Sequence, residues 1–249
     1  MANSYNYERF DNKVYGPIPF ALHSPKIGEC ATDFTARRFD GSAVRLSDFK
    51  GKRIVLETGS MTCPMFGGNI DPMNRVADRY ADDPNTVFLL LYTREAHPAP
   101  KFPAHRDDAH KLETARLVEP LLAQNRIVMI DDVVGTAHRQ WGEFPNSLWL
   151  IDEEGIVRYR SDWNHVDVLE TLLEANDLDA EVAKLGEHNM PNFKPTKIFP
   201  WLWEKSGWLS IWDMIKQLPW MRTRHQEVHR MYDGIQYMEG SNGRAGSCF

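Results

Sequence analysis

The sequence of 249 residues contains only three cysteines, and they are far apart. Because they are Cys30, Cys63 and Cys248, there is no C-x-x-C dithiol. Closely spaced zinc ligands are also missing, so we expect no metal site. Widely spaced, odd-numbered cysteines indicate free thiols in a reducing compartment.

Long hydrophobic runs and a strong excess of one charge are missing too. No apolar run approaches the roughly 20 residues that span a bilayer. The first residues lack the basic-then-apolar pattern of a signal peptide. The formal net charge of −6 argues against nucleic acid or an anionic membrane as a partner. We therefore expect a cytoplasmic protein that binds neither nucleic acid nor membrane.

Composition divides the chain into three segments. Residues 1–25 are rich in Tyr, Asn and Pro and are predicted to form an extended arm on the surface. Residues 26–178 alternate between strand and helix patterns. Residues 179–249 hold a tryptophan-rich stretch, predicted helices at 210–217 and 222–237, and a Gly- and Ser-rich tail that we expect to be mobile.

The middle segment predicts an α/β domain. The apolar run 86–92 is typical of a central parallel strand. The turn at 152–155 predicts that the last two strands are antiparallel. The predicted strands are 53–57, 86–92, 126–130, 147–151 and 156–160, with a hairpin of 33–37 and 43–46 in front; the predicted helices are 67–80, 107–124, 133–141 and 167–175.

This order of elements resembles a thioredoxin-like fold, which is a central mixed β-sheet flanked by helices. The N-terminal hairpin and the tryptophan-rich helical segment at the C-terminus are extensions of that fold. In the thioredoxin-like fold, the proline equivalent to Pro145 is cis and lies beside the active thiol. The sequence alone does not establish the isomer of Pro145 in this chain.

Cys63 stands at the most informative position of the chain. It lies between the predicted strand 53–57 and the predicted helix 67–80. The first N–H groups of a helix are unpaired, and the helix dipole favours a negative charge there. A thiolate is the reactive form of cysteine, so this position predicts a nucleophile. Pro64 suits the first helical turn.

Two hydroxyl groups on the same turn can adjust the reactivity of Cys63. Ser60 and Thr62 are placed to donate hydrogen bonds to a thiolate, which would lower its pKa. A second cluster, Glu95 and His97, follows the next strand. Because the carboxyl ends of parallel strands meet at one edge of a sheet, we expect a proton-relay group of thiolate, imidazole and carboxylate.

Several motifs of the chain are similar to those of the iodothyronine deiodinase family. Ser60-Met61-Thr62-Cys63-Pro64 resembles the family's Ser-x-Thr-selenocysteine-Pro turn, with cysteine in place of selenocysteine. Tyr92, Glu95, Ala96 and His97 match its Tyr-x-x-Glu-Ala-His segment, and Pro103-Ala104-His105-Arg106 matches its Pro-x-His-Arg segment. The strands between Pro145 and Tyr159 also fit. The resemblance covers roughly residues 27–176.

This resemblance implies an activity. The reactive chalcogen removes iodine reductively from an iodinated phenol, and a thiol cosubstrate regenerates the enzyme without a bound cofactor. By the same resemblance His105 would help to hold the phenol, and the further candidate substrate-binding residues are Tyr92, Phe66, Pro145 and Arg106. Three departures are the cysteine, the missing N-terminal membrane anchor and the tryptophan-rich segment, which has no recognised counterpart.

Two other functions remain open at this point. A peroxiredoxin-like thiol peroxidase would form a sulfenic acid at Cys63. Peroxiredoxins typically carry Pro and Thr seven and three residues before the cysteine, where this chain has Leu56 and Ser60. A non-enzymatic thioredoxin-fold module for redox sensing or binding would use the aromatic C-terminal segment as its partner surface.

Each candidate residue also has an ordinary structural interpretation. Cys63 could be a buried, inert thiol, and His97 and His105 could be loop histidines. Glu95 could form a surface ion pair with Arg94.

Outside this cluster, Cys30 is expected to pack near the hairpin, and Cys248 could reach Cys63. His225 and His229 share a helix face without a third metal ligand. The tryptophan-rich stretch is interpreted first as a homodimer contact, because buried aromatic residues dominate interface energetics.

Overall fold

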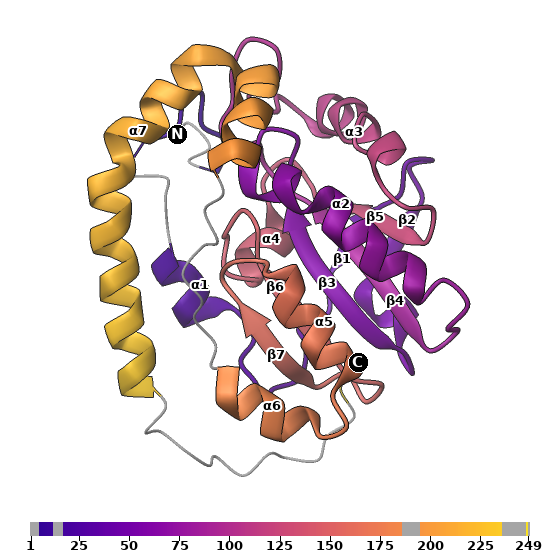
Figure 1. The fold of residues 1–249 in the computed structure, drawn as a ribbon. Coiled ribbons are helices and arrows are strands. Elements are labelled where there is room, and N and C mark those ends of the chain that lie inside the picture. The colour runs from indigo at the N-terminus through magenta and orange to yellow at the C-terminus, as the bar shows by residue number, and fades with distance from the viewer. Residues whose placement is uncertain (1–4, 12–16, 186–194, 236–247, 249) are drawn as a thin grey trace.

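The computed structural model describes residues 5–11, 17–185, 195–235 and 248. Seven strands form one mixed sheet in the order β2-β1-β5-β4-β3-β6-β7 (Figure 1). Strands β3, β4 and β5 are parallel, whereas β6 and β7 are antiparallel, as predicted. The strands are β1 (Thr35–Arg37), β2 (Ala43–Arg45), β3 (Arg53–Gly59), β4 (Thr86–Tyr92), β5 (Arg126–Ile130), β6 (Leu148–Ile151) and β7 (Val157–Ser161).

Helices cover both faces of this sheet. Because neighbouring side chains of a strand point to opposite faces, Leu89 and Leu91 of β4 pack on one side and Phe88 and Leu90 on the other. The helices are α1 (Pro17–His23), α2 (Pro64–Arg79), α3 (Asp108–Arg116), α4 (Thr136–Gln140), α5 (Val166–Glu174), α6 (Leu178–Leu185) and α7 (Pro195–Ile235), with short 3-10 turns η1 (Leu46–Phe49) and η2 (Glu119–Leu121). The predicted helix 107–124 ends early because Pro120 lacks the N–H that a continuing helix needs.

The prediction of an extended N-terminal arm is wrong for residues 17–23, which form α1. Proline is well suited to the first position of a helix, so Pro17 starts α1. Phe20 is fully buried, and its ring lies 5.6 Å from that of Trp149. Burial of this ring on the sheet gives the short helix a tertiary reason to form.

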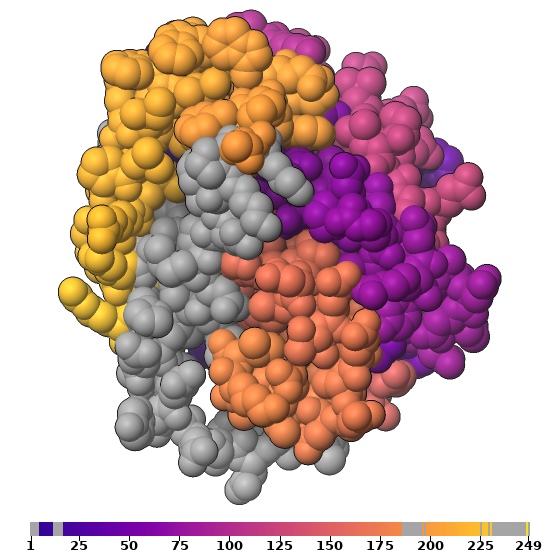
Figure 2. Space-filling view, in the orientation of Figure 1, coloured from indigo at the N-terminus to yellow at the C-terminus, as the bar shows by residue number. Residues whose placement is uncertain are grey.

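The two helices predicted beyond residue 179 are parts of one long element, α7, which runs along the side of the molecule in Figures 1 and 2. It bends at Gly207, whose φ of 73° is not helical. Pro219 lies inside it and does not end it. The predicted mobile tail falls outside the described residues except for Cys248.

The tryptophans of α7 differ in exposure. Trp203, Trp208 and Trp212 are exposed, whereas Trp201 is half-buried against α2. The homodimer contact expected here stays a prediction. None of the helices in the described ranges combines the length and apolar character that crossing a bilayer requires.

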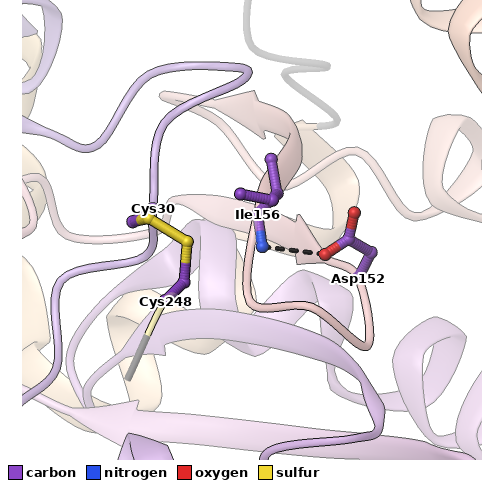
Figure 3. The surroundings of a disulfide bond; sticks show 4 residues. All are labelled: Cys30, Asp152, Ile156 and Cys248. Carbon is purple, nitrogen blue, oxygen red and sulfur yellow. Dashed lines mark hydrogen bonds between the residues drawn. A yellow bond between two sulfur atoms is a disulfide. The ribbon is translucent and has the colours of Figure 1, made fainter. Parts of the chain in front are cut away.

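The expectation of three free thiols is wrong, because Cys30 and Cys248 form a disulfide (Figure 3). Their Cα atoms are 5.2 Å apart. Cys30 pairs with Ile156 next to the β6–β7 turn, where Ile156 N donates to Asp152 Oδ1 at 2.8 Å. Cys63 is the free cysteine. A disulfide is typical of an oxidising compartment, so the cytoplasmic location stays a prediction that this bond does not favour.

Candidate active site

Cys63 is the N-cap residue of α2, and the three residues 60–62 separate it from the end of β3 at Gly59. Pro64 occupies the first turn of the helix, as predicted. The cysteine is only 2% exposed and belongs to an apolar cluster with Met61, Phe66 and Tyr92. The strand-to-helix position was therefore predicted correctly, but its burial was not.

Burial decides the protonation state of Cys63. It raises the pKa of the thiol to about 12, against the opposing effect of the backbone N–H groups of Phe66 and Met65. The negative Glu95 raises it further. The start of the helix was expected to hold a thiolate. In this structure that expectation is wrong, because desolvation of the buried sulfur outweighs the effect of the amide groups.

The neighbouring hydroxyl groups bind elsewhere than expected. Thr62 Oγ1 donates to Glu95 Oε2 at 2.6 Å, and Ser60 Oγ accepts a hydrogen bond from Ala96 N at 3.2 Å. Within the described residues, neither hydroxyl donates to the sulfur. These side chains join the cysteine turn to the loop after β4, so their role is to position that loop.

Glu95 is the centre of a buried hydrogen-bond network. Its carboxylate accepts from Thr62 N at 2.8 Å, from Thr62 Oγ1 and from the hydroxyl of Tyr92. His105 Nε2 lies 3.4 Å from Glu95 Oε1, and both side chains are fully buried. Burial would raise the pKa of Glu95, but His105, Thr62 and Tyr92 together lower it, so the carboxylate stays ionised.

The suggested surface ion pair between Glu95 and Arg94 is absent from the described residues. Arg94 pairs instead with Glu143, with Nη1 and Oε1 2.5 Å apart. The two neighbours therefore face different parts of the molecule.

His97 lies beside the cysteine turn as predicted. Its backbone N donates to Thr62 Oγ1 at 3.0 Å, and its ring centroid lies 4.5 Å from that of Phe10. Burial lowers the pKa of His97 to about 4, although Asp213 and Glu95 act in the opposite direction. The imidazole is thus neutral at pH 7. Within the described ranges its buried Nδ1 has no hydrogen-bond partner.

The predicted substrate-binding residues are distributed differently. His105 and Tyr92 are buried against Glu95, and Phe66 is buried against Gly59. Pro145 is half-buried, and no peptide bond of the described residues is cis, so the cis proline that the resemblance implies is not observed. Arg106 is exposed and its N–H donates to His110.

Residues from both ends of the chain cover Cys63, and the sequence analysis missed them. The hydroxyl of Tyr7 donates to Ala96 O at 2.9 Å. Burial raises the pKa of Tyr7 to about 12, and the nearby Cys63 contributes to that rise. From α7, Trp201 Nε1 donates to Met61 O at 2.9 Å. The unusual tyrosine and tryptophan content of the two ends was the available signal.

Trp201 packs directly over the first turns of α2. A Cβ atom on Gly67 would come within 2.2 Å of its ring, so glycine is required for this contact. In Figure 2 the orange residues at the beginning of α7 lie against the purple residues of α2.

No group of three metal-ligating side chains gathers in the part of the chain that the structure describes. The side chains of His225 and His229 lie outside that part.

The mixed sheet and the cysteine at the start of α2 define a thioredoxin-like protein. The chain is similar to the crystal structure of a thioredoxin-like protein from Bacteroides caccae, with a TM-score of 0.50 and 15% identity over 63% of this chain and 52% of that one. It is equally similar to a hypothetical protein from Sinorhizobium meliloti, with a TM-score of 0.50 and 17% identity over 61% and 84% of the two chains. At such identities the similarity shows the fold alone.

The family follows from the sequence. A sequence model of the iodothyronine deiodinase family matches residues 21–176, more than half of the chain. The chain therefore belongs to the iodothyronine deiodinase family, as its motifs predicted. No curated protein sequence matches it. Family membership supports a thiol-dependent redox function.

Proposed function

We propose that the protein removes iodine reductively from an iodinated phenol, with Cys63 as the nucleophile and an external thiol as the reductant. The observation that carries this proposal is the buried network that joins the cysteine turn to Glu95 and His105. In a chain of this family, a link from Thr62, which precedes Cys63, to Glu95 and His105 supports a proton relay at the nucleophile.

The proposed reaction begins with attack of the Cys63 thiolate on the iodine of the C–I bond. The ring carbon takes up a proton, the ring is reduced, and Cys63 becomes a sulfenyl iodide. An external thiol displaces iodide and forms a mixed disulfide, which a second thiol resolves. The sum is Ar–I + 2 RSH → Ar–H + RSSR + H⁺ + I⁻.

Four side chains have a role in this scheme, and two of them, His105 and Glu95, transfer a proton. The imidazole of His105 can bring a proton to Glu95, which is ionised and ready to accept it. Thr62 is a positioning residue, because it holds the carboxylate of Glu95 and the backbone of His97 at once. The neutral His97 has a buried Nδ1 without a hydrogen-bond partner within the described ranges, so it is suited to accept a hydrogen bond from a group that enters beside the cysteine turn.

The arrangement in this structure, in which Cys63 is buried, is not the reactive one. With a pKa of about 12, almost all of Cys63 is the thiol at neutral pH. Desolvation is the largest cause, so admitting water and substrate to the sulfur would lower this pKa toward its usual range. The start of α2 would then favour the thiolate.

Iodide release tests the proposal. We expect iodide to be released from 3,5-diiodotyrosine or thyroxine in the presence of dithiothreitol, with essentially complete loss in Cys63→Ser. Cys30→Ser is the matched control, because it removes a sulfur far from this network and should retain release. The absence of iodide release by the wild type, or undiminished release by Cys63→Ser, would contradict the proposal. Rapid oxidation by hydrogen peroxide in place of iodide release would indicate a thiol peroxidase.

A further inference from the structure

The side chain of Tyr5 is a buried phenol in a polar pocket. It is 0% exposed, and its hydroxyl lies 2.8 Å from His138 Nδ1. The same oxygen accepts the backbone N–H of Arg94 at 3.3 Å. The ring lies so close to Gly135 that a Cβ atom there would come within 2.1 Å of it. Gly135 also has a φ of 76°, which favours glycine.

Cationic side chains border the ring. The guanidinium carbons of Arg94 and Arg139 lie 4.8 and 5.2 Å from its centroid, and Lys111 Nζ lies 5.7 Å from it. Such cation–π contacts are strongest where water is excluded. We call the pocket formed by Arg94, Lys111, Gly135, His138 and Arg139 the phenol pocket.

The walls of the phenol pocket have supports besides Tyr5, although Arg94 Nη1 also donates to Tyr5 O. His138 Nε2 lies 2.9 Å from Phe144 O, and the backbone N of His138 donates to Asp131. Lys111 Nζ donates to Asp132 O at 2.9 Å, and Arg94 pairs with Glu143. These partners belong to the sheet and its connections. The pocket therefore has its own support and could accept another phenol in place of Tyr5.

The segment that brings Tyr5 is fastened at the surface. Arg9 forms two-pronged hydrogen bonds to Asp213 of α7, with the shortest distance 2.7 Å. The Arg9 side chain is 62% exposed, so solvent screens its side of the pair, whereas the Asp213 side chain is only 12% exposed. A cleft of about 310 Å³, lined by Arg9, Asp213 and apolar residues such as Pro98 and Leu209, lies at the same place.

If Tyr5 left the phenol pocket, the residues that follow it would also uncover Cys63. Between Tyr5 and Arg9, Tyr7 binds Ala96 and lies close enough to Cys63 for their charges to interact. On the other side of Arg9, Phe10 covers the ring of His97. The residues of 5–11 thus close the phenol pocket and the active site together.

We propose that the phenol pocket is a binding site for a phenolic ligand and that Tyr5 occupies it as an internal substitute, so that ligand entry displaces residues 5–11 and exposes Cys63. This inference deepens the proposed function, because an iodinated phenol belongs to the same chemical class as the tyrosine side chain. It assigns the substrate a binding site. It also explains why Cys63 is buried in this structure, since residues 5–11 cover the sulfur while Tyr5 occupies the phenol pocket.

The test uses the full chain and a ligand without iodine. The probe is p-cresol, which is the tyrosine side chain as a free molecule, and toluene is the control that lacks the hydroxyl. Binding is measured by calorimetry, and exposure of Cys63 by its rate of alkylation with iodoacetamide, followed by mass spectrometry. We expect p-cresol, but not toluene, to increase the alkylation rate of the wild type.

Two variants loosen the segment by different means. Arg9→Ala removes one of the contacts that hold residues 5–11 and should increase both p-cresol affinity and alkylation about threefold, the scale of an exposed ion pair. Tyr5→Phe keeps the ring but loses the bond to His138, and we expect about a fivefold increase. Arg45→Ala is the matched control, since its pair with Asp33 is equally exposed on the Arg side but lies on the hairpin; it should behave as the wild type.

A merely structural tyrosine would give a different result. If p-cresol leaves the alkylation of Cys63 unchanged in the wild type and in Arg9→Ala, the inference is overturned. Because p-cresol carries no iodine, this result is independent of iodide release. Displacement by p-cresol without deiodination would leave the pocket established and the proposed reaction wrong.

Discussion

The sheet with its flanking helices and the cover over Cys63 are held together in different ways. The sheet rests on continuous strand pairing and apolar packing on both faces. The cover, which consists of residues 5–11 and α7, is held by side-chain contacts such as those of Tyr7, Arg9 and Trp201 and by buried side chains such as Tyr5 and Leu202. In the proposed function the sheet fixes the reacting groups and the cover controls access to them.

Two buried glutamates show the same contrast within the sheet. Glu57 lies in the middle of β3, where Arg126 and Asn164 bind it, yet burial still raises its pKa. Glu95 lies just beyond the carboxyl end of the central strand β4, where hydrogen bonds from His105, Thr62 and Tyr92 lower its pKa. The first carboxylate holds strands together, and the second joins the cysteine turn to the loop after β4, where the proposed function gives it a proton to accept.

The largest effect is expected inside the sheet. Arg126→Met leaves Glu57 buried without its cationic partner, and we expect the free energy of unfolding to fall by about 3–5 kcal/mol. Urea unfolding at pH 7 measures this loss. The double variant Glu57→Leu/Arg126→Met should recover part of it, because no unpaired charge remains. A single-variant loss below about 1 kcal/mol would show that the sheet does not depend on this pair.

A smaller effect is expected where the cover meets the active site. The folded protein keeps His97 neutral, because burial lowers its pKa from the ordinary value of 6.5 to about 4. As pH falls through this window the unfolded state binds the proton first, so stability falls with decreasing pH. The full shift corresponds to about 3 kcal/mol. We expect His97→Gln to show correspondingly less loss of stability between pH 6.5 and 4 in denaturant unfolding, and equal curves would contradict the burial of this ring.

The smallest effect on stability is expected in α7. Trp201→Ala should lower the free energy of unfolding by about 2 kcal/mol, less than for a fully buried tryptophan, because this ring is half-buried. It should also increase the alkylation rate of Cys63. Trp203→Ala is the control, because Trp203 is 57% exposed and its loss should cost less than about 0.5 kcal/mol. Equal alkylation of the two variants would mean that α7 does not restrict access.

The sequence predicted most of the sheet and the location of Cys63. The apolar run of β4 and the turn before α2 are local patterns, and local patterns survive in the fold. The cover could not be predicted in this way. Arg9 and Asp213 are 204 positions apart, and Trp201 and Met61 are 140 apart, so no spacing in the sequence indicates their contact.

The chemistry of the site was predicted only in part. Cys63, Glu95 and His97 were expected to meet; Glu95 and the backbone of His97 both bind Thr62, next to Cys63, but it is His105 and not the His97 ring that lies beside the Glu95 carboxylate. Which hydroxyl binds which acceptor depends on geometry at the scale of one ångström, so the choice of Glu95 by Thr62 was not available from residue types. The pKa of Cys63 depends on how deeply the ends of the chain bury it, which a local motif does not specify.

The bond between Cys30 and Cys248 has a consequence for the denatured chain. It joins residues 218 positions apart, so the oxidised polypeptide is nearly a covalent ring. Closing a ring of this size lowers the conformational entropy of the unfolded chain. In the chain-entropy model this raises the free energy of unfolding by about 5 kcal/mol. The oxidised molecule would therefore migrate faster than the reduced one in a denaturing gel, and its resistance to heat would follow the redox state of its surroundings.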